Sequence, residues 1–299
     1  MILLRLMILI RRIRPQLVQT WMRQMDVLGG IASILTGVPF ILSERNCEAA
    51  YPLSIKHLLR VCAGRFAVCI ISNSFGGSRY WQKMTGSGTR THIVKNLLPL
   101  TRIENVGPSA CGIDLPSTSK VLLFAGRFSA QKNIETIIDA FEIVSSQKDV
   151  VLLLCGEGEL RSRAEELVLR KNLASKVFFL GYVQNVWGLM KRADLFISVS
   201  TYEGRPNVVL EAMACCCPLI LSDICAHREV IHDGGALFVD PKNTSDLAHA
   251  IMTCIENPEI SRQMALKAKE EVSSYSIAAI TDQYESIYRS CFHAKELKS

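Results

Sequence analysis

The second half of the chain contains six apolar runs of strand length, and helical patterns lie between most of them. The runs are Val121–Ala125, Val150–Cys155, Val177–Leu180, Leu195–Val199, Pro218–Ser222 and Ala236–Val239. Continuous apolar runs indicate strands that are buried on both faces, because a strand with one solvated face alternates apolar and polar residues. Buried strands that alternate with helices are typical of a parallel sheet covered by helices on both sides. The sequence therefore predicts an α/β domain here.

The first half shows the same alternation less regularly. Short strands are predicted at 17–20, 38–43, 68–72 and 92–95, and helices around 28–35, 54–66 and 76–84. The stretch 99–119 is rich in proline and glycine and has little periodicity, which favours a linker. We therefore predict a first domain over 1–108, a linker over 109–119, a second domain over 120–275, and a C-terminal helix over 276–299 that returns towards the first domain.

Composition narrows the class of protein. With 299 residues, 49% hydrophobic and 21% charged, the chain has enough material for two cores. A net charge of +6 favours phosphates or an anionic membrane surface and is too small to argue for nucleic acid. The 11 cysteines include Cys69, Cys155 and Cys225 in apolar runs and a consecutive triplet at 215–217, but no Cys-x-x-Cys pair. This pattern predicts reduced, buried thiols in a cytoplasmic protein and no metal site.

The N-terminal segment 1–15 is apolar but carries Arg5, Arg11, Arg12 and Arg14. Its apolar run is shorter than the roughly 20 residues that a membrane-spanning helix needs. The charges follow the apolar run, which is the reverse of a secretory signal. We predict an amphipathic helix that packs on a sheet. Contact of its arginines with an anionic membrane is the alternative.

Basic residues follow the first strand of the second domain. The loop begins at Gly126, which permits a sharp exit from the strand, and Asn133 can cap the helix that follows. Arg127 and Lys132 lie on either side of that helix start, where backbone N–H groups and the helix dipole already favour anions. Two cations at such a place suit a diphosphate, although a basic pair alone is usually solvated surface.

Three further clusters follow later strands. Gly156 and Gly158 allow close approach of the backbone or an ordinary tight turn. Gly181, Tyr182 and Val183 offer a flat side chain for a base, although a buried aromatic residue is equally natural. The fourth cluster holds two carboxylates, Glu203 at the end of a strand and Glu211 at least one turn into the next helix, with Pro206 near the first turn of that helix.

Two other interpretations of the carboxylate pair stay open at this point. Glutamates near a helix N-terminus are common for dipole reasons alone. Paired carboxylates also serve glycosidases, but the sequence singles out no general acid in an apolar pocket, and a glycosidase does not need a basic phosphate clamp.

These clusters, in this order, resemble the retaining glycosyltransferases of family 4. The resemblance covers Val121 to about Arg289, and more loosely Arg14 to Asn96. It rests on the stretches GRFSAQKN, LLLCGEGELR, VFFLGYV, ADLFISVSTYEGRPNVVLEAMACCCPLILSDI and HREVI…GGALFVDP. The resemblance implies an α/β fold of the GT-B type, with two Rossmann-like domains facing a cleft and an incomplete N-terminal domain.

The resemblance also implies roles for residues. Glu211 would accept hydrogen bonds from the ribose, and Arg127 and Lys132 would neutralise the leaving diphosphate without a metal or other cofactor. Glu203 joins these two cations as a catalytic candidate. The implied donor site consists of Gly126, Arg127, Lys132, Gly156, Gly181, Tyr182, Val183, Glu203, Gly204, Arg205, Pro206, Asn207, Val208 and Glu211.

The implied activity is transfer of a sugar from a UDP- or GDP-sugar to a glycan or lipid-linked acceptor, with retention of configuration. Such transfer would serve polysaccharide or glycoconjugate biosynthesis in the cytoplasm or on the inner face of the membrane. The first domain would hold the acceptor, with Gln24 and Arg45 as candidates.

The sequence departs from the family pattern in three respects. Gln24 stands where a histidine is common, and glutamine cannot hold a proton; Cys216 stands where a glycine is usual. The chain also begins late in the pattern, so that roughly 60–90 residues are expected to be absent at about 30 residues per βαβ unit. A catalytically silent nucleotide-sugar-binding remnant is therefore the alternative function.

Overall fold

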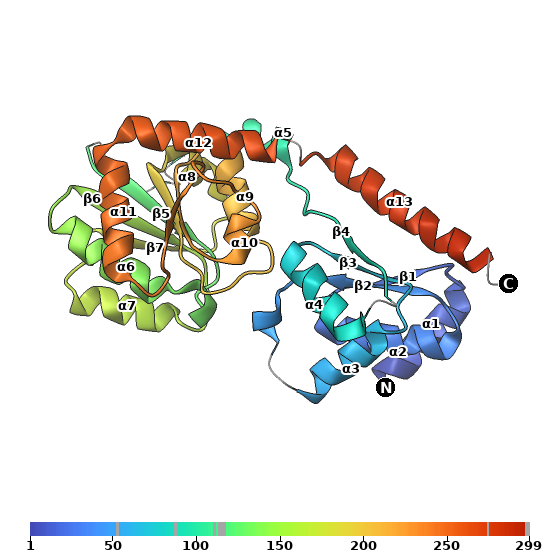
Figure 1. The fold of residues 1–299 in the computed structure, drawn as a ribbon. Coiled ribbons are helices and arrows are strands. Elements are labelled where there is room, and N and C mark those ends of the chain that lie inside the picture. The colour runs from blue at the N-terminus through green and yellow to red at the C-terminus, as the bar shows by residue number, and fades with distance from the viewer. Residues whose placement is uncertain (52–53, 87–88, 110–111, 113–117, 274, 297–299) are drawn as a thin grey trace. The chain divides into compact units, whose positions relative to one another are not determined.

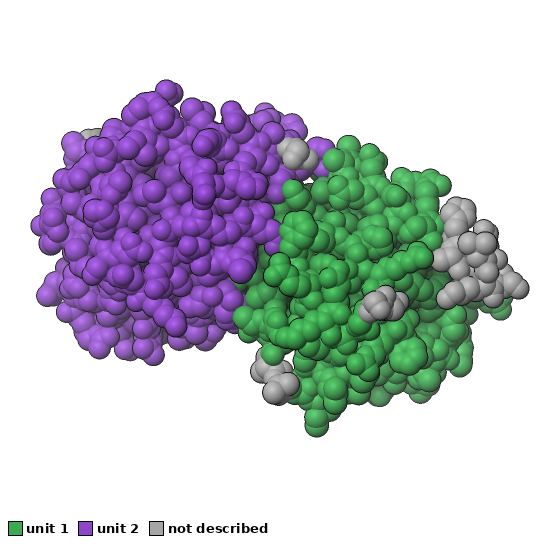
Figure 2. Space-filling view, in the orientation of Figure 1, with its two compact units in different colours: residues 1–97, 203–205, 277–299 green, residues 98–202, 206–276 purple. Residues whose placement is uncertain are grey.

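The structure, a computed structural model, describes residues 1–299 except 52–53, 87–88, 110–111, 113–117, 274 and 297–299. The chain forms two compact units, coloured separately in Figure 2. Unit 1 comprises Met1–Leu97, Glu203–Arg205 and Ile277–Ser299, and unit 2 comprises Leu98–Tyr202 and Pro206–Ser276. The chain first passes between units after Leu97. Most of the linker predicted over 109–119 lies outside the described residues.

Unit 1 contains a four-stranded parallel sheet in the order β1-β2-β3-β4 (Figure 1). Its strands are β1 Val18–Thr20, β2 Phe40–Glu44, β3 Cys69–Ser72 and β4 Thr91–Ile93. Its helices are α1 Ile2–Ile13, α2 Arg23–Thr36, η1 Glu48–Ala50, α3 Ile55–Gly64, α4 Phe75–Thr85 and α13 Ile277–Glu296. All four strands and all three helices predicted in this half are present, with ends that shift by a few residues.

Local sequence signals set the ends of these helices. The Ser54 hydroxyl caps α3 by accepting from the His57 N–H, and Ser74 caps α4 in the same way through Gly77. Helix α2 ends at Gly37, whose φ of 72° is open to glycine at little cost.

Helices cover both faces of the sheet of unit 1. On one face, Phe40, Leu42 and Ile70 pack with Trp81 of α4. On the other, a cluster of buried residues joins the sheet to α13: Ile41, Cys69, Ile71, Val94, Ile280 and Ile287. The C-terminal helix is therefore part of the core of unit 1.

Unit 2 contains a six-stranded parallel sheet in the order β10-β9-β8-β5-β6-β7. Its strands are β5 Lys120–Ala125, β6 Val150–Cys155, β7 Val177–Gly181, β8 Leu195–Ser198, β9 Leu219–Ser222 and β10 Leu237–Val239. Its helices are α5 Leu100–Glu104, η3 Ala130–Lys132, α6 Ile134–Ser145, α7 Arg161–Arg170, α8 Val186–Arg192, α9 Asn207–Ala214, α10 Cys225–Arg228, α11 Thr244–Glu256 and α12 Pro258–Val272. The six predicted strands are confirmed.

The core of unit 2 has two layers. Along β5, Val121 and Leu123 face a cluster that includes residues of α9, whereas Leu122 and Phe124 face a cluster that includes residues of α6. The predicted parallel sheet with both faces covered is therefore confirmed.

Three sequence predictions were wrong. Helix α5 lies inside the stretch 99–119 that was read as linker, because five residues are too few to show periodicity. Cys225 is exposed, since it begins the short helix α10 after β9 rather than extending an apolar strand. Asn133 precedes α6 but its side chain does not cap it, because its amide donates to the Pro241 carbonyl (2.6 Å) and its oxygen accepts from Thr136.

The N-terminal segment does form a helix, α1, with Ile10 buried, but this helix packs on α2 rather than directly on the sheet as predicted. Within the ranges that the structure describes, no helix is both long enough and apolar enough to cross a bilayer.

Candidate functional site

The sheet of unit 2 reverses its direction of growth between β5 and β8. From β5 the chain adds β6 and β7 on one side, then crosses back to add β8, β9 and β10 on the other. In doubly wound sheets, ligands bind outside the carboxyl ends of the strands at this switch point, where the two adjoining loops diverge. The segment after β5 carries Arg127 and Lys132, and Glu211 lies on helix α9, which follows β8, so three of the predicted site residues follow the two strands of the switch point.

The loop after β5 carries the two cations of the predicted diphosphate clamp. Arg127 is exposed and Lys132 is half-buried at the end of η3. The aliphatic part of Lys132 lies against Gly126, since a Cβ at that glycine would be 3.5 Å from Lys132 Cε. Arg127 forms no ion pair with any residue that the structure describes. Its guanidinium is therefore available to an external anion.

The loop after β6 fits closely against the loop after β5. Gly156 has a φ of 135°, and a Cβ there would lie 1.9 Å from the Gly126 carbonyl oxygen. Gly158 has a φ of 157°, and a Cβ there would lie 2.4 Å from the Phe128 carbonyl oxygen. The Phe128 N–H donates to the Glu157 carbonyl at 2.9 Å. Both glycines are thus required for close approach of two backbones, and the tight-turn interpretation is insufficient.

The loop after β7 begins at Gly181, whose φ is 62°. Its carbonyl accepts from the Gly156 N–H at 2.7 Å, which connects it to the glycine loop. Tyr182 is 82% exposed, so the interpretation of a buried aromatic residue is wrong. Val183 packs partly buried against the core. The exposed phenol ring leaves a flat surface at this edge of the sheet.

The loop after β8 is tied to the loop after β5 at the switch point. The Gln131 side-chain amide donates to the Tyr202 carbonyl at 2.8 Å, and the Thr201 N–H donates to the Gln131 carbonyl at 2.9 Å. Gln131 was not among the predicted site residues, because a glutamine in a loop carries no recognisable signal.

Helix α9 follows this loop, and Glu211 does not cap it. The N-cap residue is Pro206, Asn207 and Val208 open the helix, and its first turn holds no acidic residue. Helix capping therefore does not account for Glu211. Glu211 is the fifth residue of α9.

The Glu211 carboxylate is half-buried and has no cation beside it within the described ranges. Burial raises its pKa, and the neighbouring Trp187 indole offsets this shift only in part. The Trp187 N–H makes no hydrogen bond of normal geometry to a described acceptor, so it does not satisfy the carboxylate. A half-buried carboxylate is stabilised by hydrogen-bond donors. Two vicinal hydroxyl groups of a ligand would supply two such donors.

Glu203, Gly204 and Arg205 group with unit 1. Glu203 is only 8% exposed. A Cβ at Gly204 would lie 2.2 Å from the Arg45 carbonyl oxygen, and Arg205 donates to the Asn73 carbonyl at 3.1 Å. The segment is therefore held against the loops that follow β2 and β3, at the carboxyl edge of that sheet.

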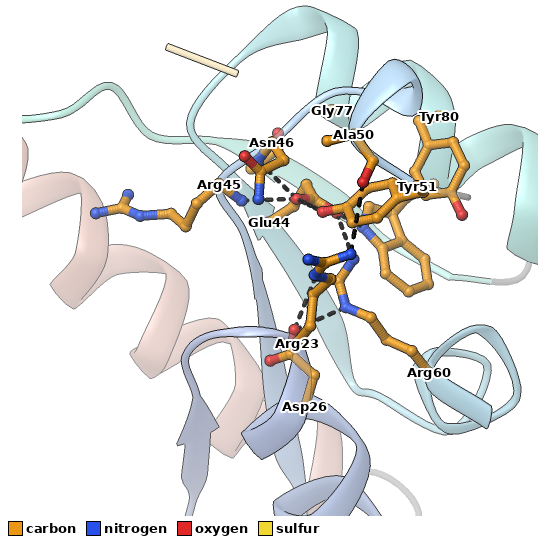
Figure 3. A network of polar contacts seen from close by, with 12 residues as sticks. Arg23, Asp26, Glu44, Arg45, Asn46, Ala50, Tyr51, Arg60, Gly77 and Tyr80 are labelled. Carbon is orange, nitrogen blue, oxygen red and sulfur yellow. Dashed lines mark hydrogen bonds and ion pairs between the residues drawn. The ribbon is translucent and has the colours of Figure 1, made fainter. Parts of the chain in front are cut away.

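The two acceptor candidates have different surroundings within unit 1. Gln24 is exposed near the start of α2 and lines a cavity with Arg23 and Lys56. Arg45 instead donates to Asn96 at 2.8 Å and lies over the Trp21 ring. Figure 3 shows its side chain pointing away from the polar network around Glu44.

The backbone conformation at Cys216 explains why the family pattern has a glycine at this position. Its φ is 57°, in the left-handed region, directly after the end of α9. Its N–H and that of Cys217 close the helix by donating to the carbonyls of Met213 and Ala212.

Among the described residues, no group of three or more His, Cys, Asp or Glu side chains could hold a metal ion.

A model of the protein family described as Glycosyl transferases group 1 matches residues 112–271. Curated relatives include N-acetyl-alpha-D-glucosaminyl L-malate synthase of Bacillus anthracis, 30% identical over 176 residues, which cover 58% of this chain and 46% of that protein. The N-acetylgalactosamine-N,N'-diacetylbacillosaminyl-diphospho-undecaprenol 4-alpha-N-acetylgalactosaminyltransferase of Campylobacter jejuni is 28% identical over 196 residues, 65% of this chain and 52% of that protein. The chain thus spans about half the length of these relatives. Both relatives are named as enzymes, which does not favour the alternative of a catalytically silent remnant.

Solved structures show the same fold. The Anabaena protein HepE in complex with UDP matches with a TM-score of 0.84 at 21% identity, over 96% of this chain and 82% of that one. Sucrose-phosphate synthase from Thermosynechococcus elongatus matches with a TM-score of 0.82 at 24% identity, over 93% and 74%. The fold is therefore α/β, with parallel sheets that match GT-B glycosyltransferases.

Proposed function

The chain belongs to the glycosyl transferases group 1 family, and from this premise we propose that it transfers a sugar from a nucleoside-diphosphate sugar to a glycan or lipid-linked acceptor with retention of configuration. The observation that carries the proposal is the switch point of unit 2, where the loop after β5 offers Arg127 and Lys132 and the helix after β8 offers Glu211. Diphosphate, ribose and sugar need complementary partners of this kind.

The two ends of the site have different chemistry. Glu211 accepts hydrogen bonds from the ribose hydroxyls, which satisfy its half-buried charge. Arg127 and Lys132 neutralise the charge that grows on the diphosphate as the bond to the sugar breaks. Because two cations and a helix start supply this charge, we propose that the reaction proceeds without a metal ion.

The remaining donor residues have supporting roles in this proposal. Gly156 and Gly181 hold the loops after β5, β6 and β7 together and so support the donor site, and the exposed Tyr182 meets the base. Glu203 and the backbone around Gly204 serve the donor sugar. The cytoplasm or the inner face of a membrane is the proposed location, since nucleotide sugars are the substrates.

Calorimetry with UDP in the presence of EDTA tests the donor site. Wild type should bind, and Glu211→Ala should weaken binding by about 3 kcal/mol, roughly a hundredfold, through the loss of two charged hydrogen bonds. Arg127→Ala should weaken it similarly. Glu166→Ala, an exposed glutamate on α7, is the matched control and should bind like wild type. Unchanged affinity in both site variants would refute the assignment.

Proton NMR of the sugar product tests the chemistry. Incubation with UDP- or GDP-sugars and a lipid-linked acceptor pool should give a product with the anomeric configuration of the donor. An inverted product would contradict the retaining mechanism, and loss of turnover in EDTA would contradict metal independence.

A further inference from the structure

Unit 1 contains a cavity of about 490 Å³ beside its buried polar network. Its polar lining consists of Arg23, Gln24, Ser54, Lys56, His57 and Arg60. The cavity lies at two helix starts, because α2 begins at Arg23 and Ser54 caps α3. These helices follow β1 and β2, so the cavity lies at the carboxyl edge of the sheet, where α/β folds bind ligands.

One wall of the cavity is a buried arginine held in a fixed orientation. Arg60 is 2% exposed and pairs with Asp26 and Glu44 at 2.8 Å each (Figure 3). Glu44 also accepts from the Trp81 indole at 2.7 Å, and Asp26 accepts from Thr20 at 2.7 Å. Neither carboxylate lines the cavity, so Arg60 stands between them and a ligand. A network so fully hydrogen-bonded fixes the guanidinium in advance of binding.

The positive charge offered to a ligand comes from Arg23 and Lys56. The formal charges of Asp26 and Glu44 exceed that of Arg60 by one, but neither carboxylate lines the cavity, and no described carboxylate pairs with Arg23 or Lys56. Arg23 lies over the Tyr51 ring, 5.7 Å from its centroid, and donates to the Ala50 carbonyl. The start of α2 has no side-chain cap, so its first N–H groups add to the positive potential.

His57 also lines the cavity, and one of its ring nitrogens is buried without a described partner. Its Nε2 contacts the Tyr80 hydroxyl, and its Nδ1 is buried without a hydrogen-bond partner among the described residues. Burial lowers the pKa of His57 and raises the pKa of Tyr80 to about 12, so both groups are neutral at pH 7. Because the neutral phenol is a stronger acid than the neutral imidazole, we assign the shared hydrogen to Tyr80 and the imidazole hydrogen to Nδ1.

We propose that this cavity binds a phosphate or diphosphate group of the acceptor, an inference that rests on the proposed transferase function. Arg23 and Lys56 are the cations that line the cavity without a described carboxylate partner, and two such donors suit the three oxygens of a phosphate better than the two of a carboxylate. The cavity is much larger than one phosphate, and Val27 and Leu28 give it an apolar wall for the group attached to that phosphate.

Calorimetry with inorganic pyrophosphate at saturating UDP tests the cavity, because UDP then fills the donor site of unit 2. Wild type should bind pyrophosphate, and Lys56→Gln and Arg23→Gln should each weaken binding about tenfold or more. Arg65→Gln, an exposed change at the opposite end of α3, is the control and should have no effect. Absence of binding, or binding that survives both cavity changes, would overturn the proposal.

A second set of titrations separates the sources of the phosphate and the two proposals. A soluble sugar phosphate and a lipid diphosphate in detergent micelles are each titrated at saturating UDP. Whichever source binds in a manner that Lys56→Gln weakens identifies the acceptor class. UDP affinity should be unchanged in Lys56→Gln, so a failure of this cavity and a failure of the donor site give different results.

Discussion

Gly156→Ala should disrupt the donor site by pushing apart two backbone segments, although it removes no side chain that binds the donor. Gly156 has a φ of 135°, where residues with a side chain are strained, and its added Cβ would lie 1.9 Å from the Gly126 carbonyl oxygen. A normal C···O contact is about 3.3 Å, so the two loops must separate by roughly 1.4 Å. That movement displaces the loop that carries Arg127 and Lys132.

The magnitude follows from two costs. The disfavoured φ costs about 1–3 kcal/mol, and overpacking against backbone atoms costs about the same. Part of this cost is relieved when the loops separate, at the expense of the hydrogen bond from the Phe128 N–H to the Glu157 carbonyl. We therefore expect the free energy of unfolding of unit 2 to fall by about 2–4 kcal/mol, and UDP affinity to fall at least about tenfold.

Urea unfolding followed by circular dichroism measures the first quantity, and calorimetry with UDP at 15 °C measures the second. Gly107→Ala is the matched control, because no atom lies within 4 Å of its added Cβ. Wild-type unfolding and wild-type UDP affinity in Gly156→Ala would refute the close approach of the two loops.

Three further predictions concern groups outside the donor site. Cys216→Gly should raise the free energy of unfolding by about 0.5–1 kcal/mol in urea titrations. The φ of 57° at Cys216 costs a residue with a side chain about 1–2 kcal/mol, and the greater chain entropy of glycine offsets part of that gain. A lower stability of the variant would contradict this. Arg60→Met should cost about 3–5 kcal/mol, since it leaves Asp26 and Glu44 buried without a countercharge, whereas the exposed Arg65→Met should change unfolding little. The Cys69 thiol, 3.8 Å from the Cys291 sulfur, lowers the pKa of Cys291 to about 7. The alkylation rate of Cys291, followed by peptide mass spectrometry, should therefore rise between pH 6 and 8 and level off above. A rate that still climbs beyond pH 9 would exclude the lowered pKa.

Local sequence patterns determined most of the secondary structure. Val150–Cys155 is an uninterrupted apolar run, and the structure has a strand with the same limits. Serines at 54 and 74 begin helices because a hydroxyl can satisfy a free backbone N–H. The placement of Arg127 and Glu211 after strands was likewise readable, since periodicity locates strand ends.

Tertiary structure alone decided what these elements meet. Strand order is not encoded in periodicity, which reports only which face of a strand is buried, so the switch point between β5 and β8 could not be read from the chain. The need for glycine at 156 comes from a carbonyl 30 residues away in the sequence, that of Gly126. Asp26, Glu44 and Arg60 are charged residues that a sequence suggests are solvated, and they become buried only because packing brings them into mutual contact.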